Sequence, residues 1–184
     1  SCTIHKTKIA TQLLQVFTQA NFAAKPNLEK FILDITGAAL KNEEAVIQFL
    51  KTIPNVKDLF LGFGHTKLTD QTLEAFSTDI LPCLVKVERL ELRIQSTKLT
   101  GLGIQRLLEN IPLNTKNLLI KMNDLEITDL IMERFLNQKL PFLFKLQELN
   151  FGVAGTCLTE SMIEQISRWE EKAIFRDIFQ DETD

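Results

Sequence analysis

Five sixteen-residue segments of this chain resemble one another, and this internal repeat constrains the fold more than any other feature. Aligned without gaps, they read NLEKFILDITGAALKN, NVKDLFLGFGHTKLTD, KVERLELRIQSTKLTG, NTKNLLIKMNDLEITD and KLQELNFGVAGTCLTE. Their first residues are Asn27, Asn55, Lys86, Asn114 and Lys145, so the spacing between successive starts alternates between a shorter and a longer value. This regular period predicts a stack of similar structural units.

Each segment carries apolar residues at every second position, as at Leu90, Leu92 and Ile94 of the third unit. A period of two predicts a strand with one buried face. The residues between the buried ones should face away from the core. Across the five strands they form three rows: Lys30, Asp58, Arg89, Asn117 and Glu148; Ile32, Phe60, Glu91, Leu119 and Asn150; and Asp34, Gly62, Arg93, Lys121 and Gly152.

A threonine follows the strand segment in four of the units, and in three of these an acidic residue comes next. The pairs are Thr69-Asp70, Thr128-Asp129 and Thr159-Glu160, whereas the third unit has Thr100-Gly101. A threonine hydroxyl can accept a hydrogen bond from the first turn of a helix, and an acid there favours the positive end of the helix dipole. Apolar residues at helical spacing follow. Each unit is therefore predicted to contain a strand, a loop, a helix and a turn.

The two ends of the chain are expected to cap this stack. Residues 6–21 have the apolar spacing of the helical half of a preceding unit, and residues 160–179 that of a helix covering the last strand. We therefore predict a single domain over residues 1–184. It comprises an N-terminal cap or half-repeat helix (1–26), five units (27–159), and a C-terminal capping helix with an acidic tail (160–184). A start at Ser1 within a half-unit is compatible with a fragment of a longer protein.

The pattern L-x-x-L-x-L, followed by a loop, Leu-Thr and a helix, resembles the leucine-rich repeat, in the long-unit subclass typified by ribonuclease inhibitor. The resemblance covers roughly residues 5–170. It implies an α/β solenoid with a curved parallel sheet on its concave face and helices on its convex face. The family's loop asparagine is replaced here by Ala38, Thr66, Thr97, Leu125 and Thr156. Because leucine has no hydrogen-bonding side chain, the turn at Leu125 is expected to be the irregular one.

Proteins of the leucine-rich-repeat family mostly bind other proteins, so the concave face is the predicted binding surface. Its central row contains three apolar residues, flanked by basic ones, at positions that face solvent and would ordinarily be polar. The predicted protein-binding residues are Ile32, Phe60, Arg89, Glu91, Arg93, Leu119 and Lys121. The competing interpretation is a slightly apolar surface or self-packing, since single exposed apolar residues need no explanation. Gly62, Gly64 and Gly152 are expected either to leave room for a partner or to mark irregular strands.

The predicted concave face is small for a tight complex. Five strands about 4.8 Å apart and about 23 Å long give roughly 550 Å² of sheet. A stable interface buries about 800 Å² per partner. A partner must therefore also engage the loops or the helices, or else bind weakly.

The sequence offers little for catalysis or for bound small molecules. It has no G-x-S-x-G, H-E-x-x-H or phosphate-loop motif. His5 and His65 are too few and too isolated for a metal site. Cys83 is expected in the core, and Cys157 has no neighbouring base to activate it. We therefore predict no enzymatic activity, no cofactor, no metal and no small-molecule substrate.

Composition narrows the partners further. The formal charge of −3 and the lack of a basic stripe argue against nucleic acid, and no apolar run is long enough to span a membrane. Three scattered cysteines, Cys2, Cys83 and Cys157, do not form a disulfide framework. We therefore expect an intracellular protein, in the cytoplasm or in a cytoskeletal or other large assembly.

Three functional hypotheses remain. The leading one is a non-catalytic protein–protein interaction module, acting as an adaptor or as a structural subunit. The second is a regulator of an enzyme, either an inhibitor or a GTPase-activating leucine-rich-repeat protein, for which Arg89 or Arg93 would be the essential charge. The third is a substrate-receptor fragment of a ubiquitin ligase. It requires an F-box-like helical segment, which is not visible ahead of the first repeat, so this hypothesis needs the chain to be a fragment of a longer protein.

Overall fold

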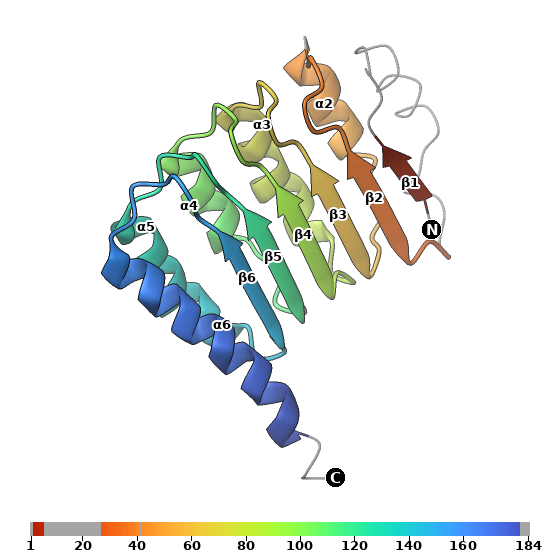
Figure 1. Ribbon diagram of the computed structural model, residues 1–184. Helices are drawn as coiled ribbons and strands as arrows, with labels where there is room; N and C mark the ends of the chain where they lie inside the picture. The colour runs from red at the N-terminus through yellow and green to blue at the C-terminus, as the bar shows by residue number, and fades with distance from the viewer. Residues whose placement is uncertain (1, 6–26, 41, 181–184) are drawn as a thin grey trace.

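The computed structural model describes residues 2–5, 27–40 and 42–180, and six parallel strands form one sheet in chain order (Figure 1). The predicted helix over residues 6–21 and the tail 181–184 lie outside the described residues. The strands are β1 (Cys2–His5), β2 (Lys30–Asp34), β3 (Asp58–Gly62), β4 (Arg89–Arg93), β5 (Asn117–Lys121) and β6 (Glu148–Gly152). The helices are α2 (Glu43–Leu50), α3 (Asp70–Ala75), α4 (Gly101–Glu109), α5 (Asp129–Arg134) and α6 (Glu160–Gln180).

The strands pair in the register that the repeat alignment predicts. Phe60 lies opposite Ile32 and Glu91, and Leu119 lies opposite Glu91 in turn. Sequence analysis missed one strand, β1, which pairs with β2 at the N-terminal edge of the sheet. The α/β architecture with a parallel sheet is confirmed.

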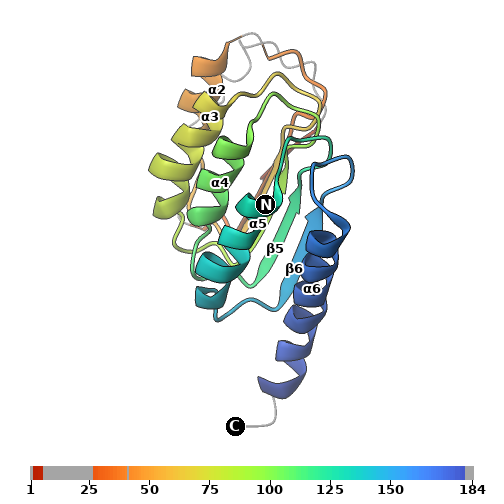
Figure 2. The same cartoon turned by 90° about the vertical axis from the view of Figure 1, so that its left-hand side faces the viewer.

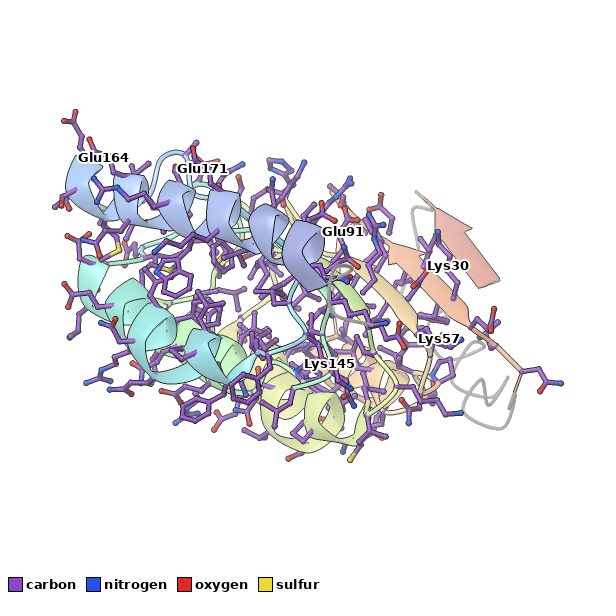
Figure 3. All side chains as sticks on the ribbon, turned by 90° about the horizontal axis from the view of Figure 1, so that it is seen from below. Lys30, Lys57, Glu91, Lys145, Glu164 and Glu171 are labelled. Atoms are coloured by element: carbon purple, nitrogen blue, oxygen red, sulfur yellow. The ribbon has the colours of Figure 1, made fainter. Side chains whose placement is uncertain are left out.

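Helices α2–α5 cover one face of the sheet only (Figure 2). The alternating strand residues that point toward them, such as Leu33, Leu61 and Leu92, are buried. The opposite face carries the three predicted rows of side chains, and we call it the open face. Figure 3, seen from below, shows Lys30 and Glu91 on this side of the sheet, away from α3–α5. The predicted orientation of the strands is therefore correct.

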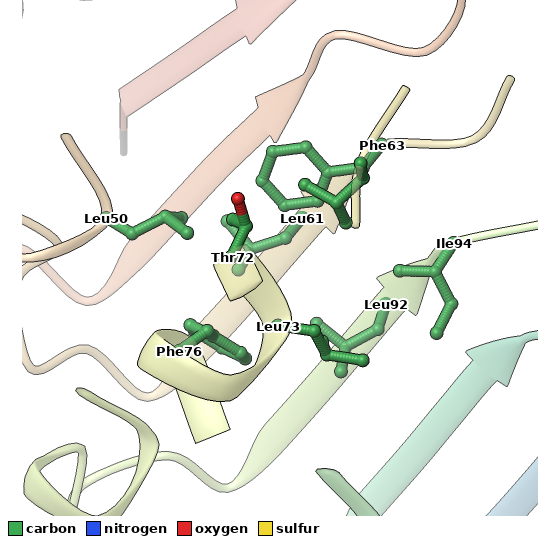
Figure 4. A pocket seen from close by; sticks show the side chains of 9 residues that line it. Leu50, Leu61, Phe63, Thr72, Leu73, Phe76, Leu92 and Ile94 are labelled. Atoms are coloured by element: carbon green, nitrogen blue, oxygen red, sulfur yellow. The ribbon is translucent and has the colours of Figure 1, made fainter. Parts of the chain in front are cut away.

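The core between sheet and helices is closely packed. Phe31 of β2 and Phe49 of α2 lie with ring centroids 6.4 Å apart. Between β3, β4 and α3 remains a cavity of about 10 Å³, lined in part by Phe63 and Phe76 (Figure 4). A single water needs about 10–15 Å³, so this cavity is too small for an organic ligand.

The threonine–acid pairs connect neighbouring units, which sequence analysis did not foresee. Asp70 Oδ1 accepts a hydrogen bond from the Thr100 backbone N–H at 2.8 Å, and its Oδ2 accepts one from the Thr100 hydroxyl at 2.5 Å. Asp129 accepts the same two bonds from Thr159, at 2.9 and 2.7 Å, and these hold its carboxyl pKa below the usual value. In each case the acid of one unit fixes the loop of the next.

The first unit makes the same connection through Glu43. One of its carboxylate oxygens, Oε1, accepts bonds from the backbone N–H and the hydroxyl of both Thr69 and Thr72, at 2.5–3.3 Å. Burial raises the pKa of this carboxyl, but the four hydrogen bonds outweigh burial and hold the pKa below 4.5.

The predicted helix-capping role of the threonines is only partly correct. The hydroxyl of Thr69 accepts a hydrogen bond from the Gln71 N–H at 3.3 Å, and that of Thr159 accepts one from the Met162 N–H at 3.3 Å. Thr100 and Thr128 make no such bond. The hydroxyl of Thr100 instead donates to the carboxylate of the preceding unit.

The five loops after β2–β6 share one backbone feature. Each contains a residue with positive φ at the same place in the unit: Gly37, His65, Ser96, Asp124 and Gly155. The next residue is threonine in three units, and its hydroxyl donates to the carbonyl three residues earlier, at 2.6–2.8 Å. Leu125 lacks this bond but is buried, and Asp124 keeps the positive φ of 60°. The turn at Leu125 therefore shares this feature of the other loops, contrary to expectation.

The alternation of short and long units has its origin in the helices. In the two long units, the helix continues into a π-helical turn and then a 3-10 turn. These segments are Phe76–Ile80 and Leu81–Cys83 after α3, and Phe135–Lys139 and Leu140–Phe142 after α5. The extra residues of the long units thus lie in a longer helical segment.

Helix α6 lies beside β6, outside the layer formed by α2–α5 (Figure 2). The Glu170 Oε1 accepts a hydrogen bond from the Phe151 backbone N–H at 2.7 Å. Burial raises the pKa of this carboxyl, and the hydrogen bond offsets only part of the effect. The helix therefore supplies a hydrogen-bond acceptor to an edge strand that would otherwise be open to pairing with another chain.

None of the helices in the described ranges is both long and apolar enough to cross a membrane.

Replacement of Leu92 by alanine tests the assignment of the strand faces. Leu92 is 2% exposed, so Leu92→Ala should lower the free energy of unfolding by about 2–5 kcal/mol. Leu102→Ala is the matched control, because Leu102 is 56% exposed and its loss should cost less than about 0.5 kcal/mol. Urea denaturation measures both. Equal losses would contradict the assignment.

Replacement of Glu43 by glutamine tests the connection between the first two units. The pKa of Glu43 is lower in the folded chain than its ordinary value of 4.5, so its ionised form stabilises the fold above that pH. Glu43→Gln should lower the free energy of unfolding at pH 7 by about 0.5–1 kcal/mol. The difference from the parent should shrink as the pH falls through the lowered pKa.

Urea denaturation at pH 3.5 and pH 7 measures this difference. Glu44→Gln is the control for lost charge, because Glu44 is an exposed neighbour whose side chain, among the described residues, accepts a hydrogen bond from Gln48 of the same helix and none from another unit. A pH-independent difference for Glu43→Gln would show that the ionised carboxylate is not what joins the units.

Candidate protein-binding site

The centre of the open face is a cluster of three predicted site residues. The Arg93 guanidinium lies 4.8 Å from the centroid of the Phe60 ring, a cation–π contact. Its Nε and Nη2 both donate to Glu91 Oε1, at 3.0 and 2.7 Å. Glu91 thus holds the Arg93 guanidinium against the half-buried Phe60 ring, and this contact restrains the ring. A restrained aromatic side chain loses little conformational entropy when a partner packs on it, so less of the binding free energy is spent on ordering it.

Beside this cluster the open face is hollowed. The hollow has a volume of about 220 Å³ and is lined by Lys30, Ile32, Asp58, Leu59, Phe60, Arg89 and Glu91. Sites for small organic ligands measure about 300–1,000 Å³, so this one is suited to a single side chain of a larger partner. Its apolar part is formed by Ile32 and Phe60, which lie opposite each other on β2 and β3.

Two cations at the hollow are available to a partner. Lys30 and Arg89 are exposed, and within the described part of the chain neither side chain makes a hydrogen bond or an ion pair. Arg93, by contrast, is engaged by Glu91. An arginine side chain presents a planar fork of donors that matches a carboxylate. Arg89 is therefore the predicted site residue best placed to pair with an acidic group.

The remaining two predicted residues lie apart from the hollow. Leu119 and Lys121 are on β5, and Glu91 separates Leu119 from Phe60 in the central row. The predicted contact patch is therefore divided. Four of its residues, Ile32, Phe60, Arg89 and Glu91, line the hollow, and Arg93 supports it.

The glycines of the open face do not leave room for a partner. A Cβ at Gly62 would lie 2.6 Å from Asp34 Oδ1, and one at Gly64 would lie 2.6 Å from Gln95 Nε2. At Gly152 it would lie 3.1 Å from Asn123 Oδ1. Neighbouring side chains of the same molecule already occupy this space. The glycines therefore permit packing between units, and the expectation of an opening for a partner was wrong.

The described part of the chain contains no group of three or more histidine, cysteine or acidic side chains arranged to hold a metal ion. His65 occupies a positive-φ turn, with φ of 56°. Cys83 is exposed, contrary to the prediction, because it ends a 3-10 turn on the surface, where its Sγ lies 3.4 Å from the Asp79 carbonyl.

Sequence analysis did not select Lys30 and Asp58 as site residues, although both belong to an aligned row. The signal that could have identified them is their position in the same row as Arg89, on the neighbouring strands. What was missing was the depth of the surface, because a row pattern shows which side chains share a face but not where the face is hollow.

Comparison with known proteins identifies similar folds. No protein-family model and no curated protein matches the sequence. The chain is similar in structure to the tropomodulin C-terminal domain from Caenorhabditis elegans, with a TM-score of 0.66, 13% sequence identity, and coverage of 93% of this chain and 99% of that one. It is also similar to actin-binding site 2 of leiomodin-1, with a TM-score of 0.59, 13% identity and coverage of 93% and 94%. At this identity the similarity concerns the fold, and the parallel sheet fits a leucine-rich-repeat architecture.

Proposed function

We propose that this chain is a non-catalytic protein-binding module that engages its partner through the open face of the sheet and the adjoining loops. The observation that carries the proposal is the hollow beside Phe60. It combines a restrained aromatic ring with a neighbouring arginine that has no partner among the described residues. Buried aromatic side chains and arginines provide much of the binding energy in protein interfaces.

The size of the open face supports a partner that extends beyond the sheet. Six strands about 4.8 Å apart, β1 with four residues and the others with five, at about 3.3 Å per residue, give roughly 460 Å². This is less than the roughly 800 Å² that each partner buries in a stable complex. The adjoining loops must supply the remaining contacts.

Actin is the first partner to test. The leiomodin-1 structure that this fold resembles is described as an actin-binding site. We therefore propose an intracellular role in a cytoskeletal assembly, with this chain as an adaptor or structural subunit.

A second candidate function, regulation of an enzyme, is favoured by one observation. Of the two arginines that could be the essential charge under this hypothesis, Arg93 is paired with Glu91, whereas Arg89 is exposed and lacks a partner in the described ranges. Arg89 is therefore the residue whose replacement by alanine should abolish regulation without unfolding the chain.

The double variant Phe60→Glu/Leu119→Glu tests the proposed function. Both side chains are only half-buried on the open face, so the variant should remain folded while binding becomes at least about tenfold weaker. Binding is measured by cosedimentation with actin filaments and by recovery of partners from native extract. Leu102→Glu/Leu130→Glu is the matched control, because both side chains are more than half exposed on α4 and α5, on the other side of the sheet.

The two measurements separate the parts of the proposal. If the parent chain does not sediment with actin, the actin assignment is wrong. Recovery of partners from native extract then still tests whether the open face binds a protein. If the double variant recovers every partner that the parent recovers, the open face is not the binding surface.

A further inference from the structure

A second apolar surface lies at the edge of the sheet where the strands begin. Four of the exposed large apolar side chains of the described residues gather here: Val85 (59% exposed), Leu113 (59%), Phe142 (56%) and Phe144 (72%). Val85, Leu113 and Phe144 are the last residues of the second, third and fourth units. We call these four residues the lower edge. Contiguous exposed apolar side chains mark interaction sites more often than scattered ones do.

Hydrogen bonds between units hold the lower edge together. The Asn114 side-chain amide donates to the Val85 carbonyl at 2.9 Å, and the Lys145 ammonium donates to Asn114 Oδ1 at 2.8 Å. The rings of Phe142 and Phe144 meet edge to face, with centroids 6.4 Å apart. The apolar side chains therefore lie on adjacent units that are fixed to one another.

Two lysines lie directly beside the apolar side chains of this edge. Lys86 directly follows Val85, and Lys145 directly follows Phe144. No carboxylate of the described residues pairs with either ammonium group. The other lysines nearby are balanced, since Lys57 pairs with Glu29 at 3.5 Å and Lys116 pairs with Glu88 at 3.1 Å. Figure 3, seen from below, shows Lys57 and Lys145 at this edge.

We propose that the lower edge binds an acidic amphipathic α-helix of a partner protein. Adjacent strands lie about 4.8 Å apart, and one helical turn advances about 5.4 Å. A helix crossing the ends of the strands can therefore place one apolar side chain on each unit, at positions i, i+3 or i+4, and i+7. Acidic residues beside this stripe would pair with Lys86 and Lys145.

A lipid surface fits this edge less well than a helix does. Each basic residue near an anionic membrane contributes about 1 kcal/mol, and recognition usually takes clusters of four to eight. Of the residues that directly follow the four apolar ones, only Lys86 and Lys145 are basic, and the whole sequence carries a formal charge of −3. The proposed site is independent of the open face, so it can fail or succeed separately from the proposed function.

Selection from a library of random 20-residue peptides tests the proposal, with the intact chain as bait. We expect the enriched peptides to carry apolar residues at helical spacing with aspartate or glutamate beside them. Fluorescence anisotropy of the most enriched labelled peptide should then show binding at least about tenfold weaker to Val85→Glu/Phe144→Glu than to the parent chain. Circular dichroism and urea denaturation establish that each variant is folded.

Three controls define the site. Leu102→Glu/Leu130→Glu adds the same charge at exposed apolar residues on α4 and α5, and it should bind the peptide as the parent does. Phe60→Glu/Leu119→Glu should also bind it, which separates this site from the open face. Lys86→Ala/Lys145→Ala should weaken binding and reduce its dependence on salt.

The following outcomes would overturn the proposal. They are enrichment of basic or extended peptides, no enrichment at all, or binding that survives the lower-edge variant. Flotation with mixed vesicles of phosphatidylcholine and phosphatidylserine, in a molar ratio of about 7 to 3, tests the membrane alternative. If the parent floats, Val85→Glu/Phe144→Glu does not, and no acidic helical peptide is selected, then the lower edge is a lipid-binding surface.

Discussion

The structure depends on the coupling of each unit to the next, because a single strand–helix unit cannot bury its apolar face alone. The parallel backbone pairing of the sheet provides one connection. The acid at the start of a helix provides another, since Asp70 and Asp129 fix the loop of the following unit through two hydrogen bonds each. Glu43 does the same with four. These connections keep the units aligned, and the alignment in turn creates continuous rows of side chains on the surface.

Because helices α2–α5 cover only one face of the sheet, the repeated architecture leaves two kinds of surface for binding. The open face gathers side chains from the middle of each strand, and its hollow lies between β2, β3 and β4. The lower edge gathers the last residue of three successive units. The two surfaces differ in character. The hollow is bordered by charges of both signs, whereas the lower edge is apolar with unbalanced lysines.

Sequence analysis succeeded where the signal is local and failed where it depends on stacking. The alternation at Leu90, Leu92 and Ile94 identified the buried face of a strand correctly, because strand geometry alone determines it. The role of Asp70 was interpreted as a favourable charge at its own helix, whereas its main bonds are to Thr100, which belongs to the next unit along the chain. That partner becomes visible only when the spacing of adjacent units is known.

The sequence by itself determined the unit, its strand and helix, the side of each strand that is buried, and the rows in which outward side chains align. These follow from local periodicity and from the regular spacing of the five repeated segments. The tertiary structure decided where the open face is hollow, which of its arginines is free to pair, and that Val85, Leu113 and Phe144 are exposed. The physical reason is that these properties depend on distances between side chains of different units. Packing sets those distances, and a pattern along one chain does not contain them.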